Sequence, residues 1–362
     1  MIGWIGDRID ALLGRGRHST AVPVMDGPLQ PNRMLDEAGV LFRQPDLDNL
    51  VADGGRIWFS AGNVLFRKDA GAEPKEVERF IGPITALSVA GGRMAIAVED
   101  RGILLRGEGE QVIASLGGQP ANCVTALALS HRDELLVAQG AQGSKAAGWK
   151  RDLMTLGCSG SVWRIEGAGR QVCLARNLAW PAGVMEEAGG SVIVSEAWRH
   201  QLVRLGGNAA PEVVLADLPG YPSRLLSTQH GPLLVVFAAR NPLHEFVLRE
   251  KAFRVRMVAE VPEEYWLAPA LSSGRSPKEP LQLGGVKQMG VMKPWAPPRS
   301  YGLVVGLRED MQPVFSLHSR ADGQMHGVTS LAICDGQLVV GAMGGGAALA
   351  LPLVSLEQED RT

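Results

Sequence analysis

Two histidines and an arginine lie close together in one short stretch near the C-terminus, SLHSRADGQMHGVTS, as His318, Arg320 and His326. Histidine exchanges protons near neutral pH, so it is the residue type best suited to general acid–base chemistry. His326 stands directly before an apolar strand and is the first candidate for a general base. The alternative is a structural histidine that binds a neighbouring carbonyl. Arg320 could bind a substrate carboxylate or cap a loop, and His318 is expected to be a structural turn residue.

A second group of chemically useful side chains lies in KPWAPPRSYG, which contains Lys293, Trp295, Arg299 and Tyr301. The two consecutive prolines fix backbone angles and stiffen this approach to the strand YGLVVGL. The segment is therefore predicted to form a rigid aromatic and basic lid over a binding site. An edge cover, in which Trp295 packs on apolar side chains, is the alternative.

The composition limits the class of protein and of partner. The chain has 362 residues, 46% apolar and 20% charged, with a formal net charge of −2. Such a chain can bury a large core and offers no basic field for nucleic acid. The 45 glycines and 22 prolines suit many short strands and tight turns.

Cysteine spacing and the N-terminal segment indicate the compartment. The four cysteines are far apart and form no CxxC pair, so neither a disulfide framework nor a thiolate zinc site is expected. Residues 2–13 have helical apolar spacing, but acidic and basic residues interrupt them, unlike a signal peptide. We expect a cytoplasmic protein without a transmembrane segment, whose N-terminal helix docks on the body or rests on a membrane surface.

A weak internal repeat decides the expected fold. Each copy has a short apolar-alternating strand, a tight turn and a second β-rich strand, and another alternating pair follows it. The copies cover residues 48–62, 84–100, 123–140, 181–197, 222–239 and 327–343. Six such units predict an all-β, six-bladed β-propeller, with a strand around residues 40–42 closing the last blade. A β-sandwich or a two-domain chain is the alternative.

The same pattern gives the expected domain organisation. Residues 1–39 form an N-terminal amphipathic helix and linker, residues 40–353 form the propeller, and residues 354–362 form a tail. A second, shorter insertion surrounds GSKAAGWKRDLMTLG. The fifth blade carries a long insertion at about 241–299, rich in proline and glycine, and such long loops are usually functional covers or disordered.

The innermost strands of a propeller begin around one mouth of the central channel, so the first residues of the six repeats should converge there. Oxygen atoms from such positions could bind a hard cation such as calcium. The ring is incomplete in this chain. The converging positions are Asp48, Asn49, Thr85, Asn122, Ala182, Ser223, Arg224, His326 and Thr329.

The chain resembles the strictosidine synthase-like propellers, which are related to the gluconolactonase and paraoxonase propellers. The resemblance covers about residues 45–353. It is clearest in SGSVWRIEG with ARNLAWPAGV, in VIVSEAWRHQLVRL, in ADLPGYPSRL, and in SYGLVVGLRED with TSLAICDGQLVVGAM. The order and spacing of these stretches, rather than any single motif, carry the resemblance.

The resemblance implies a calcium site that this chain only partly retains. Among the residues that match calcium ligands of metal-dependent relatives, Asp48 and Asn122 have suitable oxygens, whereas Ala182 replaces an asparagine. In GYPSR, Ser223 and Arg224 stand where relatives have Asp-Asn. We therefore expect Arg224 to take the place of the cation, paired with Asp48 or with Glu196 of EAWRH.

Three further residues belong to the expected mouth. Glu196 could orient a pocket residue or form an ion pair with Arg199. Tyr221, in the same turn as Arg224, is expected to contact substrate. The resemblance also places Thr329 where strictosidine synthase has its essential glutamate, so a strictosidine-type condensation is not expected.

The resulting hypothesis is a small-molecule hydrolase of lactone or ester type, or a related biosynthetic enzyme, that acts in the channel mouth without calcium. His326 would act as general base and Arg224 would stabilise an oxyanion. The remaining candidates, which would position the substrate, are Asn122, Glu196, Tyr221, Trp295, Arg299 and Arg320. The alternative is a non-catalytic propeller that binds a small anion or a protein partner.

Overall fold

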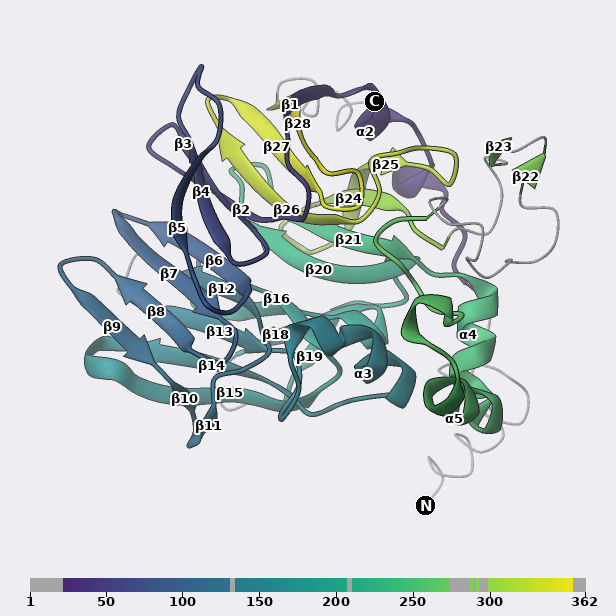
Figure 1. The fold of residues 1–362 in the computed structure, drawn as a ribbon, viewed down its shortest axis with the longest axis horizontal. Coiled ribbons are helices and arrows are strands. Elements are labelled where there is room, and N and C mark those ends of the chain that lie inside the picture. The colour runs from purple at the N-terminus through teal and green to yellow at the C-terminus, as the bar shows by residue number, and fades with distance from the viewer. Residues whose placement is uncertain are drawn as a thin grey trace.

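The computed structural model describes residues 22–130, 134–206, 210–273, 287–288, 291–292 and 299–353. These residues form six four-stranded antiparallel sheets, which follow one another around a central channel (Figure 1). The predicted six-bladed β-propeller is confirmed. The expected helix over residues 2–13 lies outside the described residues.

Each blade runs from an innermost strand at the channel to an outer strand at the surface. Blade 1 contains β2 (Leu47–Asp53), β3 (Arg56–Ala61), β4 (Val64–Lys68) and β5 (Lys75–Arg79). Blade 2 contains β6 (Ile84–Ala90), β7 (Arg93–Val98), β8 (Gly102–Arg106) and β9 (Glu110–Ile113). Blade 3 contains β12 (Val124–Leu129), β13 (Leu135–Gln139), β14 (Gly160–Glu166) and β15 (Arg170–Leu178).

The second half of the ring repeats this order. Blade 4 contains β16 (Pro181–Glu186), β17 (Val192–Glu196), β18 (Gln201–Leu205) and β19 (Glu212–Leu215). Blade 5 contains β20 (Gly220–Leu226), β21 (Leu233–Ala239), β24 (Gly302–Leu307) and β25 (Pro313–Ser319). Blade 6 contains β26 (Val328–Cys334), β27 (Gln337–Ala342), β28 (Ala347–Pro352) and β1 (Gly39–Arg43). Two short hairpins, β10 (Ser115–Leu116) with β11 (Gln119–Pro120) and β22 (Lys287–Gln288) with β23 (Val291–Met292), lie between blades 2 and 3 and inside blade 5.

Burial follows strand position within each blade and explains the sequence pattern. The second strand β21, LLVVFAA, is buried at every residue because neighbouring blades cover both of its faces. The outermost strand β5, KEVER, is mostly exposed. The apolar runs of the repeats therefore mark second strands, and the charged alternating segments mark outer strands.

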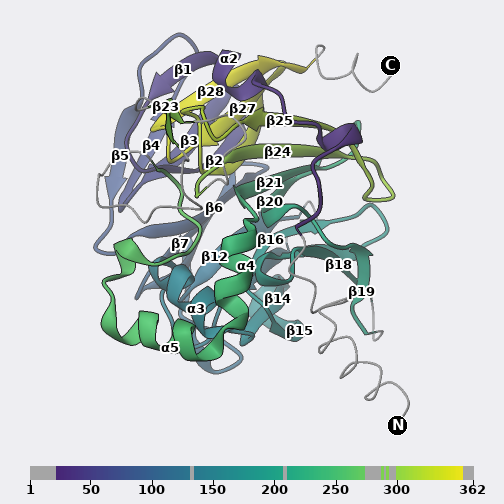
Figure 2. The same ribbon diagram turned by 90° about the vertical axis from the view of Figure 1, so that its right-hand side faces the viewer.

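The ring closes with strands from the two ends of the chain. Strand β1 pairs antiparallel with β28, with Gly39 opposite Ala350 and Arg43 opposite Ala347. Figure 2 shows β1 beside β28 and β27. Leu35, in the short helix α2 (Met34–Glu37), is fully buried in the core of blades 5 and 6. The predicted closing strand around residues 40–42 is confirmed.

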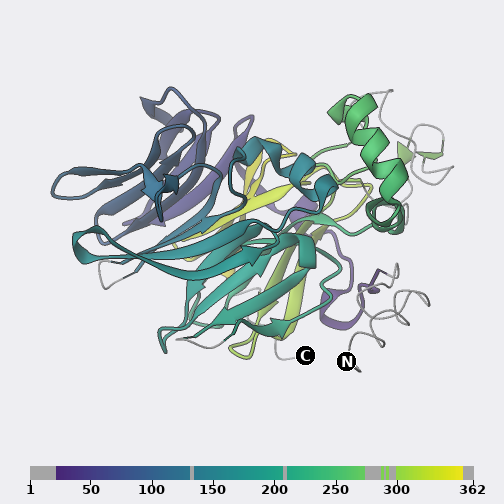
Figure 3. The ribbon, with the colours of Figure 1, turned by 90° about the horizontal axis from the view of Figure 1, so that it is seen from below.

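Most of the described helices lie at one end of the channel. We call the end where the innermost strands begin the cover end, and the end where they finish the open end. At the cover end lie η3 (Ala146–Gly148), α3 (Trp149–Thr155), η5 (Ala197–Arg199), α4 (Pro242–Arg249), α5 (Lys251–Glu260) and η6 (Glu263–Tyr265). Figure 3 shows α4 and α5 at the edge of the body, beside α3. Within the described residues, no helix combines the length and apolarity needed to cross a bilayer.

The start of the long insertion differs from the expected irregular loop. Residues 242–260 form α4 and α5, because the Asn241 side chain caps α4 by accepting a hydrogen bond from the Leu243 N–H. Pro242 at the first helical position reinforces this start. The insertion is therefore a helical cover in its first part.

Candidate functional site

An arginine joins four blades near the centre of the channel. Arg224 Nη1 donates to Asp48 Oδ1 at 2.5 Å and to the Thr329 carbonyl at 2.8 Å. Arg224 Nη2 donates to Asn49 Oδ1 at 2.5 Å and to the Thr85 carbonyl at 3.1 Å. These partners belong to β2, β6 and β26, whereas Arg224 belongs to β20. We call Arg224 and these four partners the arginine hub.

Local backbone irregularities place the charged side chains of the hub. The pairing of β2 with β3 shifts register between Asp48 and Val51, and Asn49 has a positive φ of 59°. The pairing of β20 with β21 shifts register between Pro222 and Leu225. β-Bulges redirect side chains and are common beside functional sites. Here they bring the Arg224 guanidinium of blade 5 into contact with the Asp48 carboxylate of blade 1.

The hub does not fit a calcium ion. Arg224 already supplies a cation there, and its four terminal N–H bonds satisfy the Asp48 carboxylate, the Asn49 amide oxygen and two carbonyls. Ala182, at another position implied by the resemblance, packs in an apolar cluster. Among the described residues, no three His, Cys, Asp or Glu side chains gather at a spacing suited to a metal. Arg224 therefore pairs with Asp48, one of the two expected carboxylates.

The charge and donors of Arg224 are almost fully used within the hub. Asp48 balances its charge, and the Asp48 Oδ2 contact at 3.5 Å adds to the bond from Nη1. No described residue accepts a hydrogen bond from Nε. The side chains of Arg224 and Asp48 remain 20% and 23% exposed. The hub thus presents one N–H donor with little net charge.

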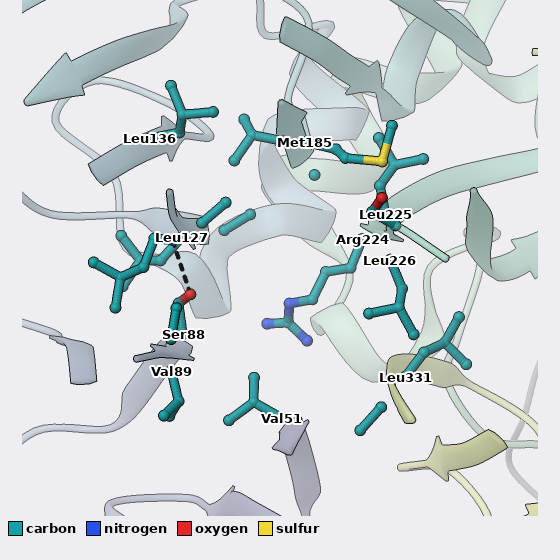
Figure 4. A pocket seen from close by; sticks show the side chains of 18 of the residues that line it. Val51, Ser88, Val89, Leu127, Leu136, Met185, Arg224, Leu225, Leu226 and Leu331 are labelled. Carbon is teal, nitrogen blue, oxygen red and sulfur yellow. Dashed lines mark hydrogen bonds between the residues drawn. The ribbon is translucent and has the colours of Figure 1, made fainter. Parts of the chain in front are cut away.

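A cavity of about 710 Å³ extends from the hub toward the open end. All six innermost strands line it, and most of the lining side chains are aliphatic. Figure 4 shows Arg224 pointing into this space, with Val51, Val89, Leu226 and Leu331 around it. The charged side chains of the lining are Arg224, Glu186 and Glu187. We call this space the channel pocket.

The channel pocket opens where the innermost strands finish. Along β2 the lining changes from Asn49, which is 2% exposed, to the half-buried Val51 and Ala52. Ala188 and Ser227, just beyond β16 and β20, are exposed lining residues. The pocket therefore becomes accessible at the open end, away from α3, α4 and α5.

Aromatic side chains and one backbone segment overlie the cover end. Trp180 stacks on Trp198 with ring centroids 5.2 Å apart, and Tyr221 packs edge-on against Trp198 at 6.0 Å. Leu271 packs on the same cluster. Its backbone also lies so close to Gly344 that a β-carbon there would clash with the Leu271 carbonyl. The part of the long insertion around Leu271 therefore lies at the cover end of the channel.

His326 lies at the cover end, outside the lining of the channel pocket. Its Nε2 is 2.7 Å from the Arg320 carbonyl and must donate, so its Nδ1 accepts from Ser300 Oγ at 2.7 Å. The ring is 5% exposed, and desolvation by burial lowers its pKa. His326 and Arg224 are not brought together in the pocket.

The other histidine of the same stretch is also bound within the protein. His318 lies in strand β25 and not in the expected turn. Its Nδ1 is 3.0 Å from the Tyr301 hydroxyl and its Nε2 is 2.7 Å from Ser316 Oγ. Burial lowers its pKa to about 4, so the ring is neutral at physiological pH. It is a structural residue of blade 5.

Two more candidates are buried in structural contacts near the cover end. Glu196 is 1% exposed, accepts from the Ala179 N–H, and binds Arg199 at 2.6 Å. This is the ion pair that the sequence offered as the alternative. Tyr221 is fully buried, and desolvation holds its pKa well above the usual range. Its hydroxyl has no hydrogen-bond partner among the described residues.

The remaining candidates do not converge on the channel pocket. Arg299 Nη2 donates to the Glu264 carbonyl at 2.8 Å, and Arg320 binds Asp322 at 3.3 Å. The Asn122 carbonyl accepts from the Gln139 side chain at 3.0 Å. Lys293 and Trp295 lie outside the described residues.

A buried polar cluster between α4 and blade 4 was not anticipated from the sequence. Arg240 binds Glu245 at 3.2 Å, and His200 Nε2 lies 3.6 Å from the same carboxylate. Against the opposing effect of desolvation, hydrogen bonds and charges from His200 and Arg240 hold the pKa of Glu245 at about 2. Neither ring nitrogen of the neighbouring His244 has a partner among the described residues. Burial lowers the His244 pKa to about 4, so this ring is neutral.

The channel pocket itself was also not anticipated from the sequence. Its signal was present in the innermost strands, where Val51, Val89 and Leu129 occupy half-buried positions. These residues lie in the second half of their strands. The expected mouth was built only from the first residues of each strand, which lie at the cover end.

Comparison with known proteins supports the fold. No family model matches the chain, and no curated protein matches it. A gluconolactonase from Xanthomonas campestris has a TM-score of 0.56 and 11% identity, with 92% of this chain and 97% of that chain covered. A calcium-binding regucalcin from Agrobacterium tumefaciens has a TM-score of 0.55 and 12% identity, with 89% and 93% covered. The chain therefore shares the fold of these propellers, and its resemblance to the strictosidine synthase-like group stays a prediction.

Proposed function

We propose that this protein is a metal-independent hydrolase of lactone or ester type that binds a neutral carbonyl compound in the channel pocket. The observation that carries the proposal is a pocket of about 710 Å³ that ends at one N–H donor of Arg224. A pocket of this volume suits a small organic molecule. Because Asp48 balances the charge of Arg224, the hub favours a neutral carbonyl oxygen over an anion.

The chemistry follows from the hub. The carbonyl oxygen of a bound ester would accept from Arg224 Nε, and the same N–H would stabilise the oxyanion formed when water adds. Asp48 is not a lining residue, but it contacts Arg224 at the end of the pocket and its side chain is 23% exposed, so it would take the proton of that water. The alkoxide of the cleaved C–O bond then leaves with this proton. His326, the base expected from the sequence, is less suitable because it lies at the cover end away from Arg224, is 5% exposed, and has both ring nitrogens bound within the protein.

The second candidate is a non-catalytic propeller that binds a small molecule or a protein partner. This candidate is favoured because both carboxylates in the lining of the pocket form ion pairs with arginines. Glu187 binds Arg204 at 2.8 Å, and Glu186 lies 3.5 Å from Arg164. An enzyme site more often presents two or more titratable groups that are free to act on a substrate.

A hydrolysis screen separates the two candidates. Purified protein is assayed on neutral lactones and esters, with added calcium and with chelator, and ligand binding is followed by thermal shift. Hydrolysis that is insensitive to chelator and strongly reduced in Asp48→Asn supports the hydrolase. Saturable binding without turnover supports the second candidate, and turnover that requires calcium contradicts the metal-independent chemistry.

A further inference from the structure

We infer that the ligand enters the channel pocket from the open end and that its body is aliphatic. This inference rests on the proposed function, because it concerns the same pocket. The entrance then lies on the face opposite α3, α4 and α5. The ligand is a carbonyl compound with an alkyl chain rather than a polyhydroxylated ring.

Access to the pocket increases toward the open end. The exposed fraction of the lining residues increases along the innermost strands: in β2, Asn49 is 2% exposed and Ala52 is half-buried. The last lining residues of these strands lie at the open end. Ala90 in β6 is the half-buried counterpart of Ala52 on the neighbouring blade. Both are small side chains at the rim of the entrance.

The opposite end of the pocket is closed. The hub shuts it off from the cover end, since Arg224 is bonded to residues of three other blades there. Beyond the hub lie the stacked Trp180 and Trp198, and the Leu271 backbone packs tightly against Gly344. A ligand coming from that side would have to displace the stacked indoles of Trp180 and Trp198 and break the ion pair of Arg224 with Asp48.

The side chains that line the pocket are mostly aliphatic, although polar groups also contribute to its surface. Aliphatic side chains and a methionine from the blades, including Val51, Val89, Met185, Leu226 and Leu331, surround the space in front of Arg224 (Figure 4). Their burial by an alkyl chain is favourable, at about 25 cal/mol for each Å² removed from water.

The walls offer few hydroxyl groups that could bind a polyol. Three serine hydroxyls are in the lining, those of Ser88, Ser130 and Ser227. The Ser88 hydroxyl accepts a hydrogen bond from the Leu129 N–H at 3.0 Å, and the Ser130 hydroxyl accepts one from the Glu134 N–H at 3.3 Å. Edge backbone groups of the innermost strands face the channel, and the aliphatic side chains of the same strands stand between them. The pocket therefore favours an alkyl lactone or ester over a sugar lactone.

The test compares two rim variants with two control variants. Ala90→Trp and Ala52→Trp each place an indole at the open-end rim, and the pair guards against misfolding of either one. Val112→Trp changes an exposed residue on the outer strand β9, and Leu156→Trp changes an exposed residue beside α3 at the cover end. Circular dichroism melts verify that each variant is folded.

Three ligands are measured: a neutral γ-lactone with a medium-length alkyl chain, glucono-δ-lactone, and the neutral fluorophore N-phenyl-1-naphthylamine. We expect the parent protein to bind the fluorophore and to release it to the alkyl lactone, but not to the sugar lactone. We expect each rim variant to lower the affinity for the alkyl lactone and for the fluorophore by about tenfold or more. The control variants should bind both ligands with the affinity of the parent protein.

The outcomes for binding and for turnover are distinguishable. If the parent protein binds the apolar ligands, the rim variants do not, and no hydrolysis is seen, then the open-end entrance is supported and the proposed hydrolase activity is contradicted. If both rim variants fold and hydrolyse the substrate as fast as the parent protein, then the hydrolase activity is supported and the open-end entrance is wrong. Loss of binding in Leu156→Trp alone would also show that the entrance is not at the open end. Preferential binding of the sugar lactone, or no binding of either apolar ligand, would show that the ligand is not aliphatic.

Discussion

Replacing Arg224 by alanine should destabilise the propeller measurably. The change removes five hydrogen bonds from Arg224 and leaves the Asp48 carboxylate with one described donor, the Asn49 N–H at 2.7 Å. Removing one partner of a buried ion pair costs about 3–5 kcal/mol. The two side chains are 20% and 23% exposed, so water reaches them from the channel. We therefore expect about 3 kcal/mol, at the lower end of that range.

This loss corresponds to a modest change in melting temperature because the protein is large. Unfolding entropy is about 2.1 cal/mol/K per residue, so about 3 kcal/mol lowers the Tm of a 362-residue chain by about 4 °C. Differential scanning calorimetry measures the shift. Arg256→Ala is the matched control, because Arg256 pairs with Glu260 on the surface of α5 and is 77% exposed. Its Tm should stay unchanged.

A double-mutant cycle tests the pairing directly. Asp48→Ala and Arg224→Ala together should cost less than the sum of the two single changes, with a coupling of about 1–3 kcal/mol. An Arg224→Ala Tm within about 1 °C of the parent, or strictly additive single changes, would refute the assigned role of the hub.

Buried residues elsewhere in the fold should respond to three simpler perturbations. The pKa of His244 is about 4 in the fold against an ordinary value of 6.5, so the unfolded chain takes up the proton first and stability falls as the pH drops from 6.5 toward 4. At pH 5 this proton uptake lowers the free energy of unfolding of the parent protein by about 2 kcal/mol, and His244→Leu should abolish that decrease. If the variant and the parent protein show the same pH dependence of Tm, the prediction is wrong. Leu35→Ala should cost about 2–5 kcal/mol because Leu35 is fully buried, whereas Val40→Ala, at 44% exposure, should leave urea unfolding nearly unchanged. In the folded protein, Cys158 should react with a thiol reagent and Cys123 should not, since Cys123 is 1% exposed and burial raises its pKa to about 12; equal rates would contradict this.

The fold was predictable because every blade repeats the same local pattern. The runs that form β7, β13 and β21 are short, apolar and bounded by turn residues, so each copy could be recognised without knowledge of the others. The helices of the insertion were missed although the sequence contained a signal. Asn241 followed by Pro242 is a helix start, and the composition of the later part of the insertion hid it.

The site was only partly predictable because its geometry depends on long-range contacts. The pairing of Arg224 with Asp48 joins residues 176 positions apart, and the sequence offered it only beside Glu196 because the choice between the two carboxylates depends on the order of the blades. Ser300 and His326 meet at the base of the long insertion, and their hydrogen bond occupies the ring nitrogen that a general base would need. No local pattern around His326 indicates that bond.

The pairing of β1 with β28 sets the order in which the protein can mature on the ribosome. Strand β1 leaves the exit tunnel before the other described strands, but Gly39 has no partner until Ala350, 311 positions later, has been synthesised. Bringing such distant segments together costs about 5 kcal/mol of chain entropy, so ring closure should come late. Until then the edge of β1 can pair with other chains. The nascent protein should therefore depend on rapid synthesis, or on chaperones, more than its finished fold suggests.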